Sequence, residues 1–390
     1  MILTNCAACA APLPHKAKQC SRCKTRYCGP ACQRQHWERG GHDALCKKIK
    51  KGGGAEQYYA DKKYKEAVAE AAEACADDTK GQTCYICTQA LHWKTKEGLV
   101  RGCACRGTSG FAHVSCLAEQ VKILVAEVEE NNLGNKAFDE RWERWYSCSL
   151  CGQDYHGVVL CAMGWAGWKT YLGRPETDWA HGLAMSLLGS GLSSADHDEE
   201  ALSVDETRLS MMRRLGACEH NMLVMQGNLA VTYERLGRHE ESLRMRQEVY
   251  SGHLRLNGKE HLETLRGAYN NVNSLYHLRR FTEAKSLMRK TVPVARSVLG
   301  DSNGDTIRMR SSYAEALYKD DGATLDDVRE SVETYEQLAR TARRVFGGAH
   351  PITEGVGLEL LDARAALRAR EMQPPSDFRE DGDLDEAEDA

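Results

Sequence analysis

Two short stretches of this chain hold most of its cysteines, and this clustering limits what the chain can fold into. Of the 17 cysteines, seven lie between residues 6 and 46 and seven between residues 84 and 151. Each stretch also carries a histidine at ligand spacing. Eight such donors fill two tetrahedral zinc sites and leave no coordination position open for water or substrate. We therefore expect structural zinc, two ions in each stretch and four in all, and no metal catalysis.

The spacing within each array identifies the candidate ligands. Two cysteines two residues apart can present both sulfurs to one metal at about 2.3 Å. Spacing alone leaves open whether the four pairs of an array share two metals in sequence or interleaved. The candidate ligands of the first array are Cys6, Cys9, Cys20, Cys23, Cys28, Cys32, His42 and Cys46. Those of the second are Cys84, Cys87, Cys103, Cys105, His113, Cys116, Cys148 and Cys151.

Composition and charge indicate the cellular compartment in which the protein is expected to work. The formal net charge of −4 gives no overall field that favours nucleic acid or a membrane surface. The lysines at 47, 48, 50 and 51 are better explained as a solvated helix end than as a nuclear signal. The N-terminal residues lack the layout of a signal peptide, and no apolar run approaches the roughly 18 residues that cross a bilayer. We expect metal-bound thiolates in a reducing cytosol or nucleus, with no disulfides.

The first array resembles a MYND finger, whose pattern is CxxC, CxxC, YCxxxCQxxxW and HxxxC. That family interleaves its sites, which implies one zinc on Cys6, Cys9, Cys28 and Cys32 and another on Cys20, Cys23, His42 and Cys46. Gly40 and Gly41 lengthen the usual spacing between tryptophan and histidine, which leaves His36 as a rival ligand. The retained HxxxC spacing favours His42.

The same resemblance implies a binding role. MYND fingers dock short proline-containing peptides in a shallow groove, and Gln33 and Trp37 stand where residues of that groove are found. For Trp37 the alternative is packing over the zinc-binding turn.

The second array resembles a RING-CH finger, in CYIC, GCACRGTSGFAHVSCL and CSLC. The resemblance implies a cross-brace, with one zinc on Cys84, Cys87, His113 and Cys116 and the other on Cys103, Cys105, Cys148 and Cys151. A structural zinc contributes about 10–16 kcal/mol of binding free energy in small peptides, as much as the stability of a domain. We expect each finger to be a metal-dependent module independent of the later helices.

RING-CH fingers recruit ubiquitin-conjugating enzymes, and Ile86 is the apolar residue that such a docking surface requires. Gln120 stands where the family has a tryptophan, and the interval from Cys116 to Cys148 is longer than usual. That interval carries an apolar stripe from Leu117 to Val128 typical of an amphipathic helix. Packing on the finger's own core explains the stripe better than partner binding.

The C-terminal half is repetitive. Glycines at 216, 258, 300 and 347 end similar segments, at steps of 42, 42 and 47 residues. Residues 227–250 align with residues 269–292, which pairs Ala230 with Val272, Tyr233 with Leu275, Leu236 with Leu278 and Ser242 with Ala284. A fixed period in this range predicts stacked helix pairs. The pattern is similar to tetratricopeptide repeats of the kinesin-light-chain kind, with four units between about residues 179 and 370.

Three cysteines and two histidines lie outside the candidate sites. Cys75, Cys161 and Cys218 match no ligand spacing, so we expect ordinary buried or half-buried thiols. His261 and His350 follow the glycine turns, where turn hydrogen bonding explains them better than metal binding.

The sequence therefore predicts a mainly α protein, with two small two-zinc fingers followed by an α-solenoid of helix hairpins. The expected segments are a MYND-type finger at 1–51, a helical linker at 52–80, a RING-CH-type finger at 81–160, helical repeats at 161–370 and a disordered acidic tail at 371–390.

Such a chain is expected to be a scaffold that binds proteins or peptides and no membrane. No GxSxG, HExxH or phosphate-binding glycine motif points to an enzyme. The alternative is a soluble ubiquitin ligase that binds a ubiquitin-conjugating enzyme and selects substrates with its repeats. A nucleic-acid-binding regulator is a weaker alternative, because no base-reading helix or basic stripe is evident.

Overall fold

The computed structural model describes residues 5–11, 13–14 and 16–372. It confirms the expected fold class, since this part of the chain is mainly α-helical, with two short paired strands near its start. The chain forms two compact units, Met1–Arg238 and His239–Ala390, which are described separately below. The tail expected to be disordered lies outside the described residues from residue 373 onward.

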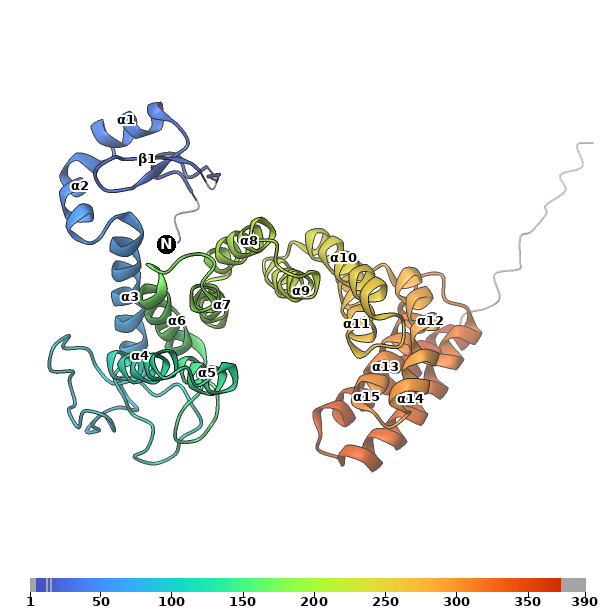
Figure 1. Cartoon of the computed structure of the whole chain (residues 1–390). Coiled ribbons are helices and arrows are strands. Elements are labelled where there is room, and N and C mark those ends of the chain that lie inside the picture. Colours follow the sequence, from blue (N-terminus) through green and yellow to red (C-terminus); the bar gives the residue numbers. More distant parts are fainter. Residues whose placement is uncertain (1–4, 12, 15, 373–390) are drawn as a thin grey trace, which may run out of the picture. The chain divides into compact units, whose positions relative to one another are not determined.

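The first unit begins with a small finger followed by helices (Figure 1). Its elements are β1 (Lys18–Gln19), β2 (Arg26–Tyr27), α1 (Pro30–Glu38), α2 (His42–Lys51), α3 (Ala55–Ala74), α4 (Val114–Glu130), α5 (Asn135–Trp142), the 3₁₀ turn η1 (Glu143–Trp145), α6 (Gly157–Tyr171), α7 (Trp179–Ser194), α8 (Asp198–Arg214) and α9 (Glu219–Arg235). The strands are antiparallel, with Lys18 opposite Tyr27. Tyr27 and Ile49 are fully buried in the finger's own small core.

The second cysteine-rich segment lies between α3 and α4 and continues after η1. Its cysteines belong to one large core with the helices that follow, where Cys84, Cys116 and Cys148 are buried together with Val159 of α6 and Leu188 of α7. The backbone of Gly102 joins this core directly, since its carbonyl accepts a 3.0 Å hydrogen bond from the amide of His156 just before α6. The boundary expected after residue 160, between the second finger and the repeats, therefore lies within one continuous core.

Three further expectations concern the apolar stripe, the segment between the two fingers, and two cysteines outside the candidate sites. The apolar stripe forms α4, whose residues Leu117, Val121 and Val128 are buried, so packing is confirmed as its role. The segment expected to be a linker between the fingers forms α3, which packs on α6. Cys161 is buried, and burial raises the pKa of its thiol to about 12. Cys218 is exposed, contrary to the expected burial.

Helices α6 and α7 pack unusually closely because both carry glycines at the contact. A Cβ atom added to Gly164 of α6 would lie 3.0 Å from the carbonyl oxygen of Leu187. One added to Gly191 of α7 would lie 2.8 Å from the carbonyl oxygen of Leu160. The helix backbones therefore approach closely at both glycines, and a methyl group at Gly191 does not fit without a shift of the backbone.

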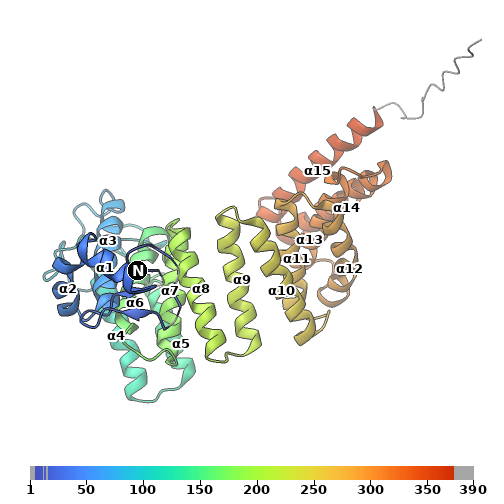
Figure 2. The same cartoon turned by 90° about the horizontal axis from the view of Figure 1, so that it is seen from above.

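The second unit is a series of helix hairpins, visible from two directions in Figures 1 and 2. Its helices are α10 (His239–Asn257), α11 (Leu262–His277), α12 (Phe281–Leu299), α13 (Gly304–Lys319), α14 (Leu325–Phe346) and α15 (Pro351–Glu371). Each helix packs on the next, and α13 also contacts α11 and α15. The short turns and regular stacking match the solenoid expected from the repeat.

The structure gives physical reasons for the repeat pattern. The glycines at 216, 258, 300 and 347 have positive φ angles of 69–86°, which a side chain with a Cβ rarely adopts. The paired positions Ala230 and Val272 are both fully buried, as are Ser242 and Ala284. Small residues at these positions allow neighbouring helices to approach closely.

Two histidines of the repeats act as helix caps, as expected. The Nδ1 atom of His261 accepts a 3.2 Å hydrogen bond from the amide of Glu263, and that of His350 accepts one of the same length from Ile352. Each satisfies one backbone donor that the first turn of a helix leaves unpaired.

None of the helices in the described part of the chain is both long and apolar enough to span a bilayer.

We predict that Gly191→Ala destabilises the protein by about 1–3 kcal/mol, because the added methyl group forces α6 and α7 apart. Urea unfolding monitored by circular dichroism measures the change. Gly182→Ala is the matched control, since Gly182 also lies within α7 but has open space around it. There the gain in helix propensity should stabilise the protein by about 0.5–1 kcal/mol. Equal effects of the two substitutions would show that the close contact is unimportant.

Candidate metal centres

The sixteen candidate ligands form four separate groups in the structure. The groups are Cys6, Cys9, Cys28 and Cys32; Cys20, Cys23, His42 and Cys46; Cys84, Cys87, His113 and Cys116; and Cys103, Cys105, Cys148 and Cys151. Within each group the donor atoms lie within 4.8 Å of one another. The structure thus brings the ligands together in the interleaved sets that the two resemblances imply. Four donors of sulfur and imidazole nitrogen, without carboxylates, suit Zn²⁺.

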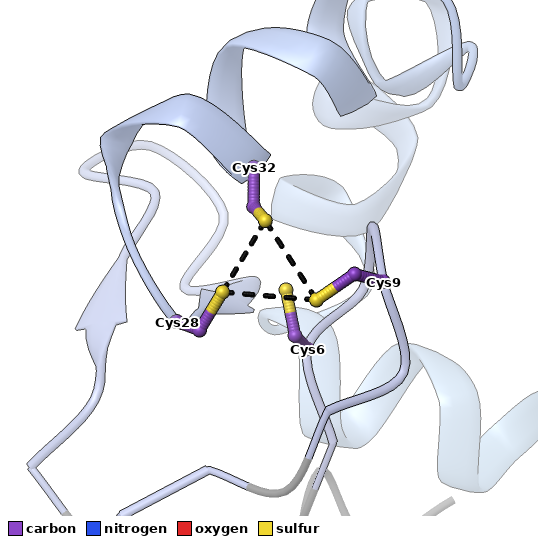
Figure 3. Close-up of side chains that lie close together, drawn as sticks. All are labelled: Cys6, Cys9, Cys28 and Cys32. Atoms are coloured by element: carbon purple, nitrogen blue, oxygen red, sulfur yellow. Dashed lines mark hydrogen bonds between the residues drawn. The ribbon is translucent and has the colours of Figure 1, made fainter.

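The first group joins the N-terminal turn to the start of α1. Figure 3 shows the sulfurs of Cys6, Cys9, Cys28 and Cys32 pointing toward one another. The sulfurs of Cys9 and Cys28 are 3.7 Å apart, as are those of Cys9 and Cys32. A tetrahedron with bonds of 2.3 Å places its sulfurs about 3.8 Å apart, which these two separations match. The sulfurs of Cys28 and Cys32 are closer, at 3.2 Å.

The second group contains His42 and leaves His36 outside. The Nε2 atom of His42 is 3.4 Å from the sulfur of Cys23, and the His42 side chain is fully buried. His36 instead shares a 3.0 Å hydrogen bond with the hydroxyl of Tyr27 through its Nδ1 atom. The glycines before α2 therefore place the later histidine in the cluster, in agreement with its HxxxC spacing.

The two groups of the second array alternate along the chain in the same way. His113 directs its Nδ1 atom to the cluster, 3.3 Å from the sulfur of Cys87 and 3.6 Å from that of Cys116. Its Nε2 atom lies 3.4 Å from the carbonyl of Ala90, an acceptor that orients the ring and fixes its tautomer. In the other group the sulfurs of Cys105 and Cys148 are 3.8 Å apart.

The two CxxC turns of the second array have matching geometry. The amide of Ile86 donates to the sulfur of Cys84, and the amide of Leu150 donates to the sulfur of Cys148, both at 3.4 Å. Such bonds neutralise part of the thiolate charge outside the metal bonds.

Hydrogen bonds alone cannot keep four sulfurs ionised together. Burial opposes ionisation of Cys6, but backbone amides of Cys28, Ala8 and Cys9 outweigh it and lower the pKa of this thiol to about 6. Hydrogen bonding to Cys28 and Cys9 raises the pKa of Cys32 to about 12. One thiolate of the group thus forms at the expense of another, and a divalent cation would stabilise all of them at once.

The fourth group behaves in the same way. The backbone amide of Gln153 is the main cause that lowers the pKa of Cys151 to about 7. Burial is the main cause that raises the pKa of Cys105 to about 11. With four donors in each group, the arrangement can crosslink the chain but presents no open position for catalysis.

Some residues that support the groups were not identified from the sequence. The hydroxyl of Thr25 lies 3.1 Å from the sulfur of Cys23. A Cβ atom at Gly110 would lie 2.6 Å from the Cβ of Cys105, and the φ of Gly110 is +84°. The glycine in the GTSGF segment was the one available signal, because a position beside a metal site often excludes a side chain.

The residues predicted to bind partners lie at the surface of the fingers. Trp37 of α1 is 43 % exposed, while its ring also meets that of His42 edge-on at 5.7 Å. It therefore packs over the zinc-binding region and remains accessible. Gln33 is half-buried one helical turn earlier, and Ile86 is 37 % exposed.

Comparison with known families identifies the first finger. Residues 6–46 match the family model described as the MYND finger. The chain carries a MYND finger. MYND fingers bind zinc, so zinc is the metal of this segment. The RING-CH assignment of the second array remains a prediction.

The repeats are also identified. Residues 223–263 and 268–305 match the family model of the tetratricopeptide repeat. The first match covers α9 and α10, and the second covers most of α11 together with α12. The kind of repeat expected from the 42-residue period is therefore confirmed.

Two solved structures are similar to part of this chain. The putative kinesin light chain of Podosopora anserina, with nearly identical TPR-like repeats, is 16 % identical, and the match covers 60 % of this chain and 98 % of that one with a TM-score of 0.42. BtubC from P. vanneervenii is 10 % identical, with coverages of 68 % and 95 % and a TM-score of 0.36. The search of curated proteins found no match.

We predict that His42→Ala lowers the zinc content by about one ion per chain, because the second group loses one of its four donors. Native mass spectrometry of the intact protein measures the content. His36→Ala is the matched control and should keep its zinc, since His36 is bonded to Tyr27. A loss of zinc from the His36 variant alone would reverse the ligand assignment.

We predict that Cys103→Ser releases about one zinc ion and loosens α6 and α7, because they share a core with the second finger. Hydrogen–deuterium exchange should speed up in residues 157–194 and stay unchanged in residues 262–346, which belong to the other unit. Unchanged exchange in α6 and α7 would mean that the finger and these helices are energetically independent.

Proposed function

We propose that this protein is a zinc-dependent scaffold that brings partner proteins together. The observation that supports this most directly is the combination, in one chain, of a MYND finger and tetratricopeptide repeats. Tetratricopeptide repeats bind proteins on extended surfaces formed by successive hairpins. We further propose that four zinc ions are bound and that the protein works in a reducing compartment, the cytosol or the nucleus.

The surface of the MYND finger suits peptide docking. Helix α1 has no fully buried residue, and Trp37 on it is 43 % exposed. Gln33 and Trp37 are four residues apart and therefore lie on the same face of the helix. An indole ring beside an amide offers apolar contact and hydrogen bonds to an extended peptide, which is the kind of site that aromatic anchors dominate.

The repeats of the second unit carry a groove of their own. A hollow of about 300 Å³ is lined by residues of α11, α13 and α15, the first helices of consecutive hairpins. Its lining includes Asn273, Arg308, Ser311, Glu315 and Glu359. Amide, guanidinium and carboxylate groups side by side can bind the backbone and polar side chains of a peptide.

We predict that Trp37→Ala weakens binding of proline-containing peptides about tenfold or more, because a central aromatic anchor is lost. The measurement is fluorescence anisotropy of labelled peptides, each tested beside a version with its prolines replaced by alanine.

Gln33→Ala should also weaken this binding, and Gln35→Ala is its matched control. Gln35 is exposed on the same helix, but two residues along it faces another direction. Trp37→Ala should retain its zinc, so the peptide result is separable from unfolding. Equal binding by the wild-type protein and the Trp37 variant would remove the MYND groove from the proposal.

The second candidate function is that of a ubiquitin ligase, and one surface feature favours it. Ile86 and Leu150 occupy matching positions in the two CxxC turns and are 37 % and 53 % exposed. The turns lie side by side, since the hydroxyls of Tyr85 and Ser149 are 3.2 Å apart. Two exposed apolar side chains on adjacent turns could dock a ubiquitin-conjugating enzyme. Gln120, in place of the usual tryptophan, weakens this candidate.

If the protein is a ligase, it should form ubiquitin chains on itself with some member of a panel of conjugating enzymes, and Ile86→Ala should abolish them. The matched control is Ile123→Ala, an exposed isoleucine of α4 outside the CxxC turns. Absence of chains with every enzyme, while zinc is retained, would leave the scaffold as the function.

A further inference from the structure

The first unit contains a second hollow, of about 510 Å³, that the proposed function does not use. It lies among α5, η1, α6, α7 and the turn that carries Cys148 and Cys151. Its lining combines aromatic rings, among them Trp142 and Trp179, with the carboxylates of Asp139 and Asp154 and with leucine side chains of α6 and α7. A hollow of this size accommodates one long side chain together with the backbone around it.

Four of the lining residues are aromatic, and packing holds them in place. Trp142 is buried and stacks on Phe138, with ring centroids 5.6 Å apart and planes 15° apart. Phe138 also meets the ring of Trp179 at 6.0 Å. Trp179 is 56 % exposed, so one face of its indole is open to a ligand although the ring is anchored.

The other two aromatic residues belong to the zinc-binding turn. The amide of Tyr155 donates a 2.7 Å hydrogen bond to the carbonyl of Tyr146, and Ser147 pairs with Asp154 in an antiparallel bridge. The turn between them carries Cys148 and Cys151. The metal group therefore fixes this wall of the hollow, which needs no large rearrangement to receive a ligand.

The polar groups of the hollow are carboxylates, which only accept hydrogen bonds, and hydroxyls, which can both accept and donate. Asp139 and Asp154 supply carboxylates, Ser186 and Ser190 supply hydroxyls, and the two tyrosines supply phenolic oxygens. Among the residues that the structure describes, no lysine, arginine or histidine lines the hollow. The site thus presents negative charge and aromatic faces without a cation of its own.

We propose that this hollow binds an arginine side chain of a partner protein. A guanidinium group is a planar, weakly hydrated cation with five donors and no acceptor. It stacks on indole and phenol rings and donates to carboxylates and hydroxyls at its edge. A lysine ammonium has the same charge but is strongly hydrated and cannot stack, so it gains less from aromatic walls. The site lies outside the MYND groove and outside the residues that match the tetratricopeptide repeat, 223–263 and 268–305.

The test uses the full-length, zinc-loaded protein in which 5-fluorotryptophan replaces the tryptophans. Binding is followed in the ¹⁹F NMR spectrum. The probes are the N-acetyl, N-methylamide derivatives of arginine, lysine and citrulline. Citrulline has the shape of arginine without the charge. The arginine probe should shift the Trp142 and Trp179 resonances saturably, with a dissociation constant in the millimolar range. The citrulline probe should bind about tenfold more weakly. Assignment uses Trp142→Phe and Trp179→Phe.

Substitutions at the hollow test the same assignment. Trp179→Ala should weaken arginine binding about fivefold, and Asp139→Asn and Asp154→Asn about threefold each, as expected for partly exposed contacts. Trp93→Ala and Glu140→Gln are matched controls, since both residues are exposed and neither lines the hollow. They should leave binding unchanged.

Three results would overturn the proposal. The first is the absence of shifts at Trp142 and Trp179 with the arginine probe. The second is equal or tighter binding of lysine or citrulline, which would show that guanidinium chemistry is not recognised. The third is an equal loss of binding in the control variants. None of these results bears on the scaffold function, which depends on other surfaces.

Discussion

Repulsion between cysteine thiolates is the constraint on which the N-terminal half of the structure depends. Each of the four groups holds its donor atoms within 4.8 Å of one another. Thiolates at such distances repel one another unless a cation lies among them. Hydrogen bonds lower the pKa of Cys6 but raise that of Cys32, so they do not favour both thiolates together. A dication both neutralises the charge and crosslinks segments that are distant in sequence. Small regions with few apolar side chains can fold in this way.

The cysteine groups of the second finger also take part in the packing of the neighbouring helices. In the second finger they join the same core as α6 and α7, where Gly164 and Gly191 bring the helix backbones into contact. The turn that carries Cys148 and Cys151 lies between Tyr146 and Tyr155, which line one wall of the acidic aromatic hollow. Metal binding, helix packing and a candidate binding surface are therefore parts of one arrangement, and a defect in one should reach the others.

The C-terminal unit is stabilised differently. Its helices bury small and apolar side chains such as Ala268, Ala284 and Ala295 against their neighbours. Glycine turns and capping side chains end and begin the helices. Each hairpin stabilises the next, so stability is distributed along the array. The groove across α11, α13 and α15 follows from this regular stacking, because equivalent helices present their side chains to a common side.

The sequence by itself determined the features that arise from short-range spacing. CxxC turns, HxxxC spacing and the 42-residue period depend on residues close together in the chain, and family resemblance supplied the pairing of the ligands. His261 and His350 could be identified as turn residues for the same reason. Only the tertiary structure decided that α3 packs on α6, that the second finger shares its core with later helices, and that Trp142 and Trp179 line one hollow with Asp154. Those contacts join segments tens of residues apart, and a single sequence contains no local pattern that records which distant surfaces meet.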